Sequence, residues 1–169
     1  LRDALFAAAS FHRFHACPRL HMANMAQTVN VLQALVLTRG RKMLLTPTWH
    51  VYEMLMPHRG GTLIEARTDA PEVTSPTGTS APSVSVSAST AEEGDLFLSV
   101  VNLDLATEQE LRLHIDGARL VPRDVRHLTA SDIRAHNTFE EPERVMPRQG
   151  AFTDEGLRLT VPAKSLTTC

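Results

Sequence analysis

Hydrophobic residues recur with helical spacing in the first third of the chain. Two segments, 1–16 and 46–56, carry apolar residues at about every third or fourth position, which predicts two amphipathic helices. Thr46 and Pro47 are typical of an N-cap and a first helical position. A short apolar run at 19–24 without clean alternation predicts a buried strand between the helices. The order helix, strand, helix indicates a piece of α/β architecture.

After residue 60 the pattern has a period of two. Val84, Val86 and Ala88 alternate with polar residues, which predicts a strand that is buried on one face only. Similar runs are separated by short turn signals, and this spacing is typical of an antiparallel sandwich. The predicted strands are 62–66, 83–90, 96–103, 108–115, 125–128, 144–146 and 156–161, with turns at 92–95, 116–117, 149–150 and 154–156.

The connecting segments are predicted from composition. Residues 68–82 are rich in Pro, Ser, Thr and Gly and poor in apolar residues, so we expect a flexible exposed loop. Residues 39–41 predict a turn that leads into a short strand at 42–45. The segment 27–37 fits either a helical turn or an extended stretch, and its periodicity does not decide between them.

Charge is unevenly divided along the chain. The 169 residues are 43% hydrophobic and 21% charged, and the net charge of −2 argues against a general nucleic-acid binder. Residues 1–60 hold seven Arg and Lys against two acids, whereas residues 61–169 hold ten against seventeen. Two chemically different segments, 1–60 and 61–169, are the simpler interpretation. A basic arm that binds a polyanion is the alternative for the first part.

The two cysteines, Cys17 and Cys169, do not form a disulfide framework. This composition favours a reducing compartment, and we expect a cytoplasmic rather than a secreted protein. No apolar run reaches the roughly 18 residues of a membrane span, so we expect no membrane association. The chain starts at Leu1 and stops within a predicted strand at 165–169, and both ends suggest a fragment.

The densest group of possible metal ligands lies on either side of Pro18. Histidine and cysteine suit zinc, but their spacing here matches no standard zinc motif. We therefore predict no metal site and interpret these residues as surface and helix-end side chains, with a zinc site as the alternative. The group consists of His12, His15, Cys17 and His21.

The residues alone give no catalytic motif. No phosphate-binding loop, dinucleotide fingerprint or nucleophile elbow occurs, so no cofactor is predicted. Hydrolysis of a glycoside needs two carboxyl groups about 5–10 Å apart. Only Asp3 and Glu53 are available in residues 1–60, and neither follows a predicted strand. The fragment therefore contains no convincing acid/base pair.

Four stretches, in order along the chain, carry a resemblance to a known family. Together they resemble glycoside hydrolase family 51, the α-L-arabinofuranosidases, whereas one stretch alone would not be specific. The long segment 68–82 departs from the family pattern. The four stretches are 19–34 (RLHMANMAQTVNVLQA), 45–54 (LTPTWHVYEM), 137–145 (NTFEEPERV) and 161–165 (VPAKS).

The resemblance implies a (β/α)8 barrel followed by a jelly-roll-like antiparallel β-sandwich. This chain would be an α+β fragment, mainly β, with 1–60 as the last helix–strand–helix of the barrel and 61–169 as the sandwich. The family also implies a retaining hydrolase, often a homo-oligomer, that removes terminal non-reducing α-L-arabinofuranosyl residues from arabinoxylan, arabinan or oligosaccharides. Both catalytic glutamates would lie upstream, so we expect this fragment alone to be inactive.

One substrate-binding residue follows from the resemblance. The most apolar stretch, 21–38, carries three amides, Asn24, Gln27 and Asn30. The resemblance places Gln27 just past the last barrel strand, where active sites of barrels form and where its amide would meet bound arabinose. The alternative is that Gln27 pairs with backbone in the core. Asn24 and Asn30 are expected to be structural.

A non-catalytic binding or interaction module is the alternative function for residues 61–169. Carbohydrate-binding sandwiches usually present aromatic platforms, but the only aromatic residues here are Phe97, Phe139 and Phe152. A third interpretation is that the sandwich only supports the barrel and helps oligomerisation.

Overall fold

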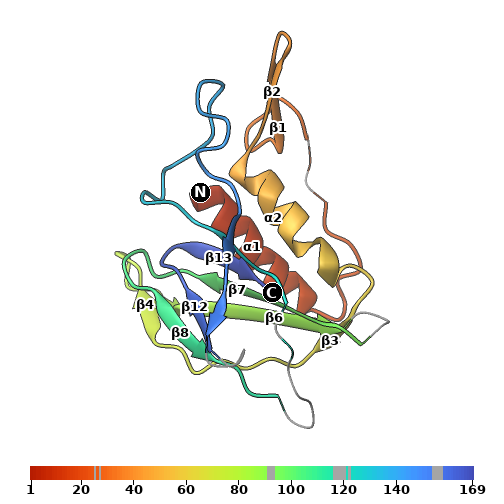
Figure 1. The fold of residues 1–169 in the computed structure, drawn as a ribbon, viewed down its shortest axis with the longest axis vertical. Helices are drawn as coiled ribbons and strands as arrows, with labels where there is room; N and C mark the ends of the chain where they lie inside the picture. The colour runs from red at the N-terminus through yellow and green to blue at the C-terminus, as the bar shows by residue number, and fades with distance from the viewer. Residues whose placement is uncertain (25, 27, 91–93, 116–120, 122, 154–157) are drawn as a thin grey trace.

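Helices α1 and α2 lie side by side on one face of an antiparallel sheet, and a smaller sheet covers the opposite face (Figure 1). This computed structural model describes all residues except 25, 27, 91–93, 116–120, 122 and 154–157. The mainly β architecture and its antiparallel sheets confirm the fold class predicted from the sequence. Neither helix is long and apolar enough to cross a membrane, among the residues described.

The two predicted helices are confirmed. Helix α1 spans Arg2–His15, and α2 spans Pro47–Leu55 before a short 3-10 helix, η1, at Met56–His58. Thr46 is the N-cap of α2, but its hydroxyl donates a hydrogen bond to the Ala34 carbonyl at 2.9 Å instead of capping the helix.

The larger sheet has the strand order β10-β9-β13-β7-β6-β3, and every pairing is antiparallel. Strand β13 lies between β9 and β7, so Thr167 pairs with His127 on one side and with Val100 on the other. The strands are β3 (Thr62–Ile64), β6 (Val84–Thr90), β7 (Leu96–Asn102), β9 (Val125–Leu128), β10 (Arg148–Gly150) and β13 (Ser165–Thr168).

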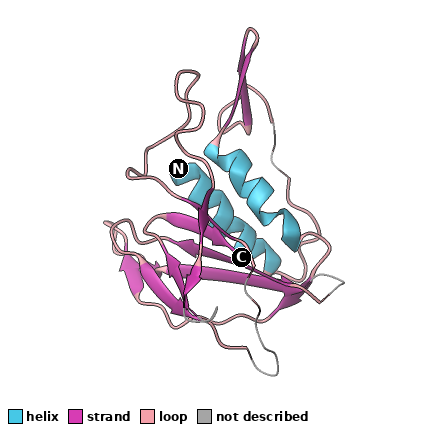
Figure 2. Cartoon of the chain, in the orientation of Figure 1, coloured by secondary structure: helices cyan, strands magenta, loops and turns pink. Residues whose placement is uncertain are grey.

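The smaller sheet has the order β11-β12-β8, with β8 at Gln109–Arg112, β11 at Phe152–Thr153 and β12 at Arg158–Val161 (Figure 2). Alternation along β7 divides its apolar side chains between two cores, with Val100 in one and Val101 in the other. One core, between the sheets, is formed by Val84, Val100, Val125, Leu159 and Val161. The other, between the larger sheet and the helices, includes Leu5, Ala8, Val51, Met54, Val101, Leu128 and Leu166.

Two hairpins project from these layers. Strands β1 (Val36–Arg39) and β2 (Lys42–Leu45) pair across a turn in which Gly40 has a φ of 61°, a conformation that glycine adopts without strain. Strands β4 (Glu72–Thr74) and β5 (Ser80–Pro82) pair within the segment predicted as a loop. The prediction of an exposed segment at 68–82 thus missed a short hairpin.

Two strand predictions are wrong. Residues 19–24 are exposed and form no strand, because a buried parallel strand needs neighbours on both edges and this chain supplies none there. Residues 144–146 are also not a strand. The strand β10 instead starts at Arg148 and includes Gln149 and Gly150, which were predicted as a turn. The predicted turns at 116–117 and 154–156 lie outside the described residues, and so do residues 92 and 93 of the predicted turn at 92–95.

Candidate functional site

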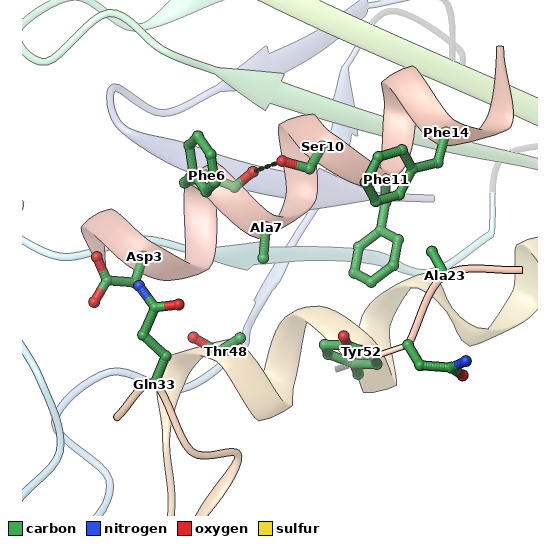
Figure 3. Close-up of a pocket in the computed structure, with 11 residues that line it drawn as sticks. Asp3, Phe6, Ala7, Ser10, Phe11, Phe14, Ala23, Gln33, Thr48 and Tyr52 are labelled. Carbon is green, nitrogen blue, oxygen red and sulfur yellow. Dashed lines mark hydrogen bonds between the residues drawn. The ribbon is translucent and has the colours of Figure 1, made fainter. Parts of the chain in front are cut away.

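A groove lies between α1 and α2 in the described part of the chain. It has a cavity volume of about 160 Å³. Aromatic side chains form much of its wall, and the Phe11 and Tyr52 rings meet edge to face with centroids 4.9 Å apart (Figure 3). The lining residues are Asp3, Phe6, Ala7, Ser10, Phe11, Phe14, Ala23, Asn24, Gln33, Thr48 and Tyr52.

The polar groups of α1 in this groove are used locally. The Asp3 carboxylate accepts a hydrogen bond from Arg2 at 3.0 Å, and the Ser10 hydroxyl donates to the Phe6 carbonyl at 2.8 Å. The Phe6 side chain, by contrast, is 75% exposed.

Gln27, the predicted substrate-binding residue, lies outside the described residues. The segment that follows it is fixed to the β1–β2 hairpin. The Thr28 carbonyl accepts hydrogen bonds from the N–H groups of Leu35 at 2.9 Å and Val36 at 3.2 Å. The Asn30 side chain donates to the Thr38 hydroxyl and accepts from the Thr38 N–H, each at 2.7 Å.

The predicted structural role of Asn30 is therefore confirmed. Asn30 has a φ of 55°, a conformation that asparagine tolerates better than most residues. Asn24 does not share this role in the structure: it is exposed and lines the groove. Within the predicted segment 27–37, residues 28–35 are largely irregular, and the chain becomes extended where β1 begins, at Val36.

The two carboxylates of residues 1–60 do not form a pair. Asp3 is bound to Arg2, while both oxygens of Glu53 accept hydrogen bonds from Arg126 at 2.8 and 2.7 Å. Each carboxylate thus has its own arginine on a separate part of the surface. This arrangement stabilises structure and offers no general acid opposite a nucleophile.

Three histidines meet the serine face of the larger sheet. His12 places its Nδ1 2.9 Å from Ser85 Oγ and its Nε2 2.9 Å from Ser99 Oγ. His58 places its Nδ1 2.8 Å from Ser89 Oγ and its Nε2 2.6 Å from the same Ser99 hydroxyl. We call this the histidine–serine network; its members are His12, His15, His58, Ser85, Ser87, Ser89 and Ser99.

Burial sets the protonation of this network. Burial, together with the charges of His58 and His15, lowers the pKa of His12 from 6.5 to about 3. Burial, with His15 as the second cause, lowers the pKa of His58 to about 4. The rings of His15 and His58 also pack edge to face at 4.9 Å. At neutral pH both buried rings are uncharged, which suits a packing interface.

The interpretation of His12 as a surface residue is therefore wrong. His12 is 4% exposed, because it continues the buried stripe of α1 onto the sheet. Cys17 and His21 are exposed and take no part in the network. Within the described ranges, no group of three or more His, Cys, Asp or Glu residues is arranged to hold a metal ion.

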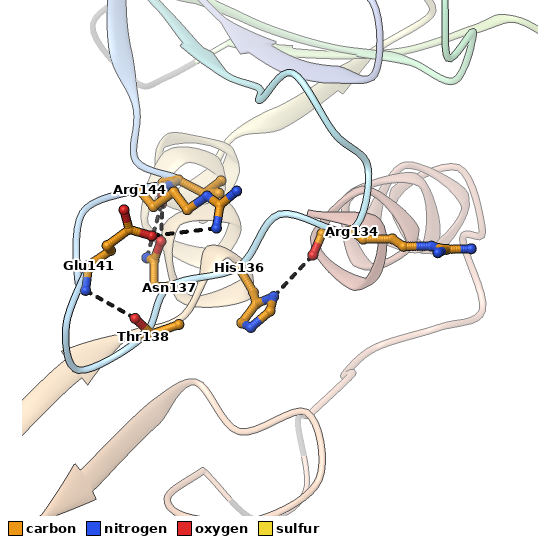
Figure 4. A network of polar contacts seen from close by, with 7 residues as sticks. Arg134, His136, Asn137, Thr138, Glu141 and Arg144 are labelled. Atoms are coloured by element: carbon orange, nitrogen blue, oxygen red, sulfur yellow. Dashed lines mark hydrogen bonds and ion pairs between the residues drawn. The ribbon is translucent and has the colours of Figure 1, made fainter.

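A second polar cluster joins the hairpin β1–β2 to the loop 137–145. The buried Asn137 amide donates to the Leu45 carbonyl at 2.8 Å, at the end of β2. Thr138 and Glu141 close the loop through a hydrogen bond from the Glu141 N–H to the Thr138 hydroxyl (Figure 4). The stretch 137–145 carries part of the family resemblance, but its contact with the end of β2 was not predicted from the sequence.

Known proteins match the chain over almost its whole length. Residues 1–165 match the family model of the alpha-L-arabinofuranosidase C-terminal domain. The chain is 33% identical over 172 residues to the intracellular exo-alpha-L-arabinofuranosidase of Bacteroides ovatus, covering 99% of this chain and 34% of that protein. It therefore spans about a third of the length of the curated relative that it matches.

Solved structures show the same similarity. The GH51 arabinofuranosidase from Xanthomonas axonopodis pv. citri matches with a TM-score of 0.87 and 35% identity, covering 98% of this chain and 34% of that one. A family 51 alpha-L-arabinofuranosidase from Bifidobacterium longum matches with a TM-score of 0.88 and 22% identity, covering 99% of this chain and 34% of that one. The second likeness shows a shared fold.

Proposed function

This chain belongs to the family of alpha-L-arabinofuranosidase C-terminal domains, and we propose that it works as the C-terminal part of an alpha-L-arabinofuranosidase. The reaction is the retaining hydrolysis of terminal non-reducing α-L-arabinofuranosyl residues from arabinoxylan, arabinan or oligosaccharides. The catalytic glutamates lie upstream, and this chain alone is inactive. The observation that carries the proposal is the family match over residues 1–165.

The groove between the helices supports the proposed division into 1–60 and 61–169. One side of α1 packs on the larger sheet through Leu5 and Ala8, whereas Phe6 and Phe14 on its other side remain exposed. In a (β/α)8 barrel, the outer helices pack on the barrel strands. We assign the exposed side of α1 to that contact.

Gln27 is assigned to the substrate in this proposal. The residues around it support the assignment, because 28–38 are held by the hydrogen bonds of Thr28 and Asn30. A side chain that binds a sugar hydroxyl needs such a fixed backbone to keep its amide in place. Substitution of Gln27 by Ala should raise KM for an aryl arabinofuranoside more than about tenfold, since a buried polar contact to the sugar is lost.

The decisive experiment compares two proteins on the same substrate. The full-length protein that contains this chain should hydrolyse an aryl α-L-arabinofuranoside, and the product measured at early times should keep the anomeric configuration. The 169-residue chain alone should show no turnover. Absence of activity in the full-length protein would refute the proposed reaction, and turnover by the chain alone would refute the upstream position of the glutamates.

The alternative of a sugar-binding sandwich has no support in the described structure. Phe97 packs against His58 at 4.6 Å, and Phe139 lies under the Arg39 guanidinium. Phe152 packs against the core between the sheets. The aromatic residues after position 60 are thus occupied within the protein. Titration of the chain with arabinan by calorimetry tests this, and binding would favour the alternative.

We also expect the full-length protein to be a homo-oligomer, which light scattering would measure.

A further inference from the structure

The hairpin β1–β2 is held by a loop that comes about 100 residues later in the chain. The Arg39 guanidinium at the end of β1 lies 4.4 Å from the centroid of the Phe139 ring. The same guanidinium donates a hydrogen bond to the Glu140 carboxylate at 2.9 Å. The Phe139 ring therefore contacts the flat face of the Arg39 guanidinium, and the Glu140 carboxylate binds its edge. The side-chain hydrogen bond to Arg39 lowers the pKa of the Glu140 carboxyl.

The base of the hairpin is fixed by the same loop. Asn137 is 5% exposed and donates its amide to the Leu45 carbonyl at 2.8 Å and to the Val145 carbonyl at 3.0 Å. Its oxygen accepts a hydrogen bond from the Val145 N–H at 2.7 Å. One buried side chain thus joins both ends of the loop 137–145 to the end of β2. The loop contacts the hairpin at both β2 and β1.

The hairpin in turn is bonded to the segment that contains Gln27. The Thr28 carbonyl accepts the N–H of Val36, the first residue of β1, and the Asn30 side chain pairs with Thr38. The order of contacts along the structure is therefore loop 137–145, hairpin, then residues 28–30. The hairpin is thus bonded directly to Thr28, the residue that follows Gln27 in the sequence.

The position of the hairpin in the chain connects it to the catalytic face of the proposed barrel. In the proposed division α2 is the last helix of the barrel, and the hairpin directly precedes it, so the hairpin lies in the connection that leads into that helix. In barrel enzymes such strand-to-helix connections form the catalytic face. The hairpin extends away from both sheets of the sandwich (Figure 1).

We propose that the loop 137–145 positions the β1–β2 hairpin at the substrate site, with Phe139 and Glu140 as positioning residues that act through Arg39. This inference rests on the proposed function. A loop of the sandwich thereby becomes part of the substrate-binding apparatus without touching the reacting atoms. The proposed catalytic glutamates lie upstream of this chain. The loop therefore affects the affinity for substrate, measured as KM, and leaves kcat unchanged.

The ring of Phe139 should matter more than the charge of Glu140. Arg39 and Glu140 are 62% and 70% exposed, and exposed ion pairs contribute little because solvent screens them. Stacking of a guanidinium on an aromatic ring is less sensitive to screening, and lysine cannot replace its planar contact. Phe139→Ala should therefore have the larger effect, Glu140→Gln a smaller one, and Phe139→Tyr should preserve the wild-type behaviour.

The first measurement is hydrogen exchange of the full-length protein, followed by mass spectrometry. In Phe139→Ala, amides of residues 36–45 should exchange about three- to tenfold faster than in the wild type, while those of β6 and β7 stay unchanged. Arg67→Ala, which removes an exposed arginine between β3 and β4, is the matched control and should change neither. Unchanged exchange at 36–45 in Phe139→Ala would overturn the proposed contact.

The second measurement is steady-state hydrolysis of an arabino-oligosaccharide by the same proteins. Phe139→Ala should raise KM about three- to tenfold with kcat within twofold of the wild type, and Phe139→Tyr should restore KM. An unchanged KM in an active protein would overturn the positioning role, as would an equal loss in kcat. A wild-type protein without arabinofuranosidase activity would refute the proposed function and with it the link to substrate. Hydrogen exchange would then still decide whether the loop holds the hairpin.

Discussion

His12 and His58 contact the same hydroxyl group, because the Nε2 atoms of the two rings lie 2.9 and 2.6 Å from Ser99 Oγ. Ser99 has one hydroxyl proton, so at most one of the two Nε2 atoms can accept it and at least one must carry its own proton. Neutral histidines can meet this requirement, because each ring has one nitrogen that donates a proton and one that accepts. Their hydrogen bonds to the serines join the helices to the sheet. Two charged rings would lie close together in this buried site and repel each other.

The stability of the chain should fall as the pH drops below about 6.5. In the unfolded chain these histidines bind protons with a pKa near 6.5, whereas in the folded chain the pKa of His12 is about 3 and that of His58 about 4. Between these values the unfolded state binds more protons, so each histidine removes up to about 1.4 kcal/mol of unfolding free energy per pH unit. Urea unfolding at pH 7.5, 6.0 and 5.0 measures this.

A matched pair of variants identifies the source of that pH dependence. His58→Gln cannot titrate and should flatten the loss of stability between pH 6.5 and 4, although it is less stable than the wild type at pH 7.5. His136→Gln changes an exposed histidine and should keep the wild-type slope. Equal slopes in all three proteins would show that other groups cause the acid sensitivity.

Ser83 offers a test of an unsatisfied buried hydroxyl. Its Oγ is fully buried, and among the described residues it has no hydrogen-bond partner. An unpaired buried polar group costs about 1–3 kcal/mol, so Ser83→Ala should leave the unfolding free energy unchanged or raise it by about 1 kcal/mol. Ser165→Ala is the control, because the Ser165 hydroxyl donates to the Pro162 carbonyl and its loss should destabilise the chain by about 1 kcal/mol. A clear loss of stability in Ser83→Ala would indicate a partner that the structure does not contain.

Asn137→Ala should be among the most destabilising single changes in the second part of the chain. It removes three hydrogen bonds and leaves the N–H of buried Val145 without a partner, so we expect a loss of about 2–4 kcal/mol. Chemical denaturation followed through Trp49, the single tryptophan, measures it. Thr138→Ala, in the same loop, removes a single hydrogen bond, which is exposed to solvent. A loss of unfolding free energy as large as that of Asn137→Ala would contradict this ranking.

The pair Glu53–Arg126 should contribute only modestly to stability. The geometry is bidentate, with oxygen–nitrogen distances of 2.8 and 2.7 Å, but the two side chains are about a third exposed. After allowance for solvent screening, a double-mutant cycle of Glu53→Gln and Arg126→Gln should give a coupling of about 0.5–1 kcal/mol, reduced by salt. A coupling that salt does not change would argue against an ion pair in solvent.

Local sequence signals predicted the elements whose stability is mostly local. The helical period and Pro47 located α1 and α2 correctly, alternation located β6, and a run of strand-forming residues located β7. The strand at 19–24 failed because a strand depends on hydrogen-bonded neighbours, which a local pattern does not contain. The substrate-binding role of Gln27 stays a prediction, because that residue lies outside the described residues.

The histidine–serine network was missed although the sequence carried a signal for it. His12 and His15 continue the spacing of Leu5 and Ala8 along one side of α1, and serines occupy every second position of β6. A polar face on an alternating strand is usually exposed to solvent, so the prediction left one face of β6 uncovered. Only tertiary packing brings two such polar faces together, and their hydrogen bonds then replace those to water.

The central place of β13 has a consequence for the order of folding. Strands β7 and β9 are synthesised first but become neighbours only through residues 165–168, which pair with both. While a ribosome makes this chain, the β6–β7 hairpin therefore has one edge with unpaired backbone groups until residues 165–168 have been synthesised. Such an edge can pair with another nascent chain, and long-range pairing of this kind is slow. We expect chaperones to bind and protect the newly made chain during that interval. The folded protein, in which this edge is paired, should need them less.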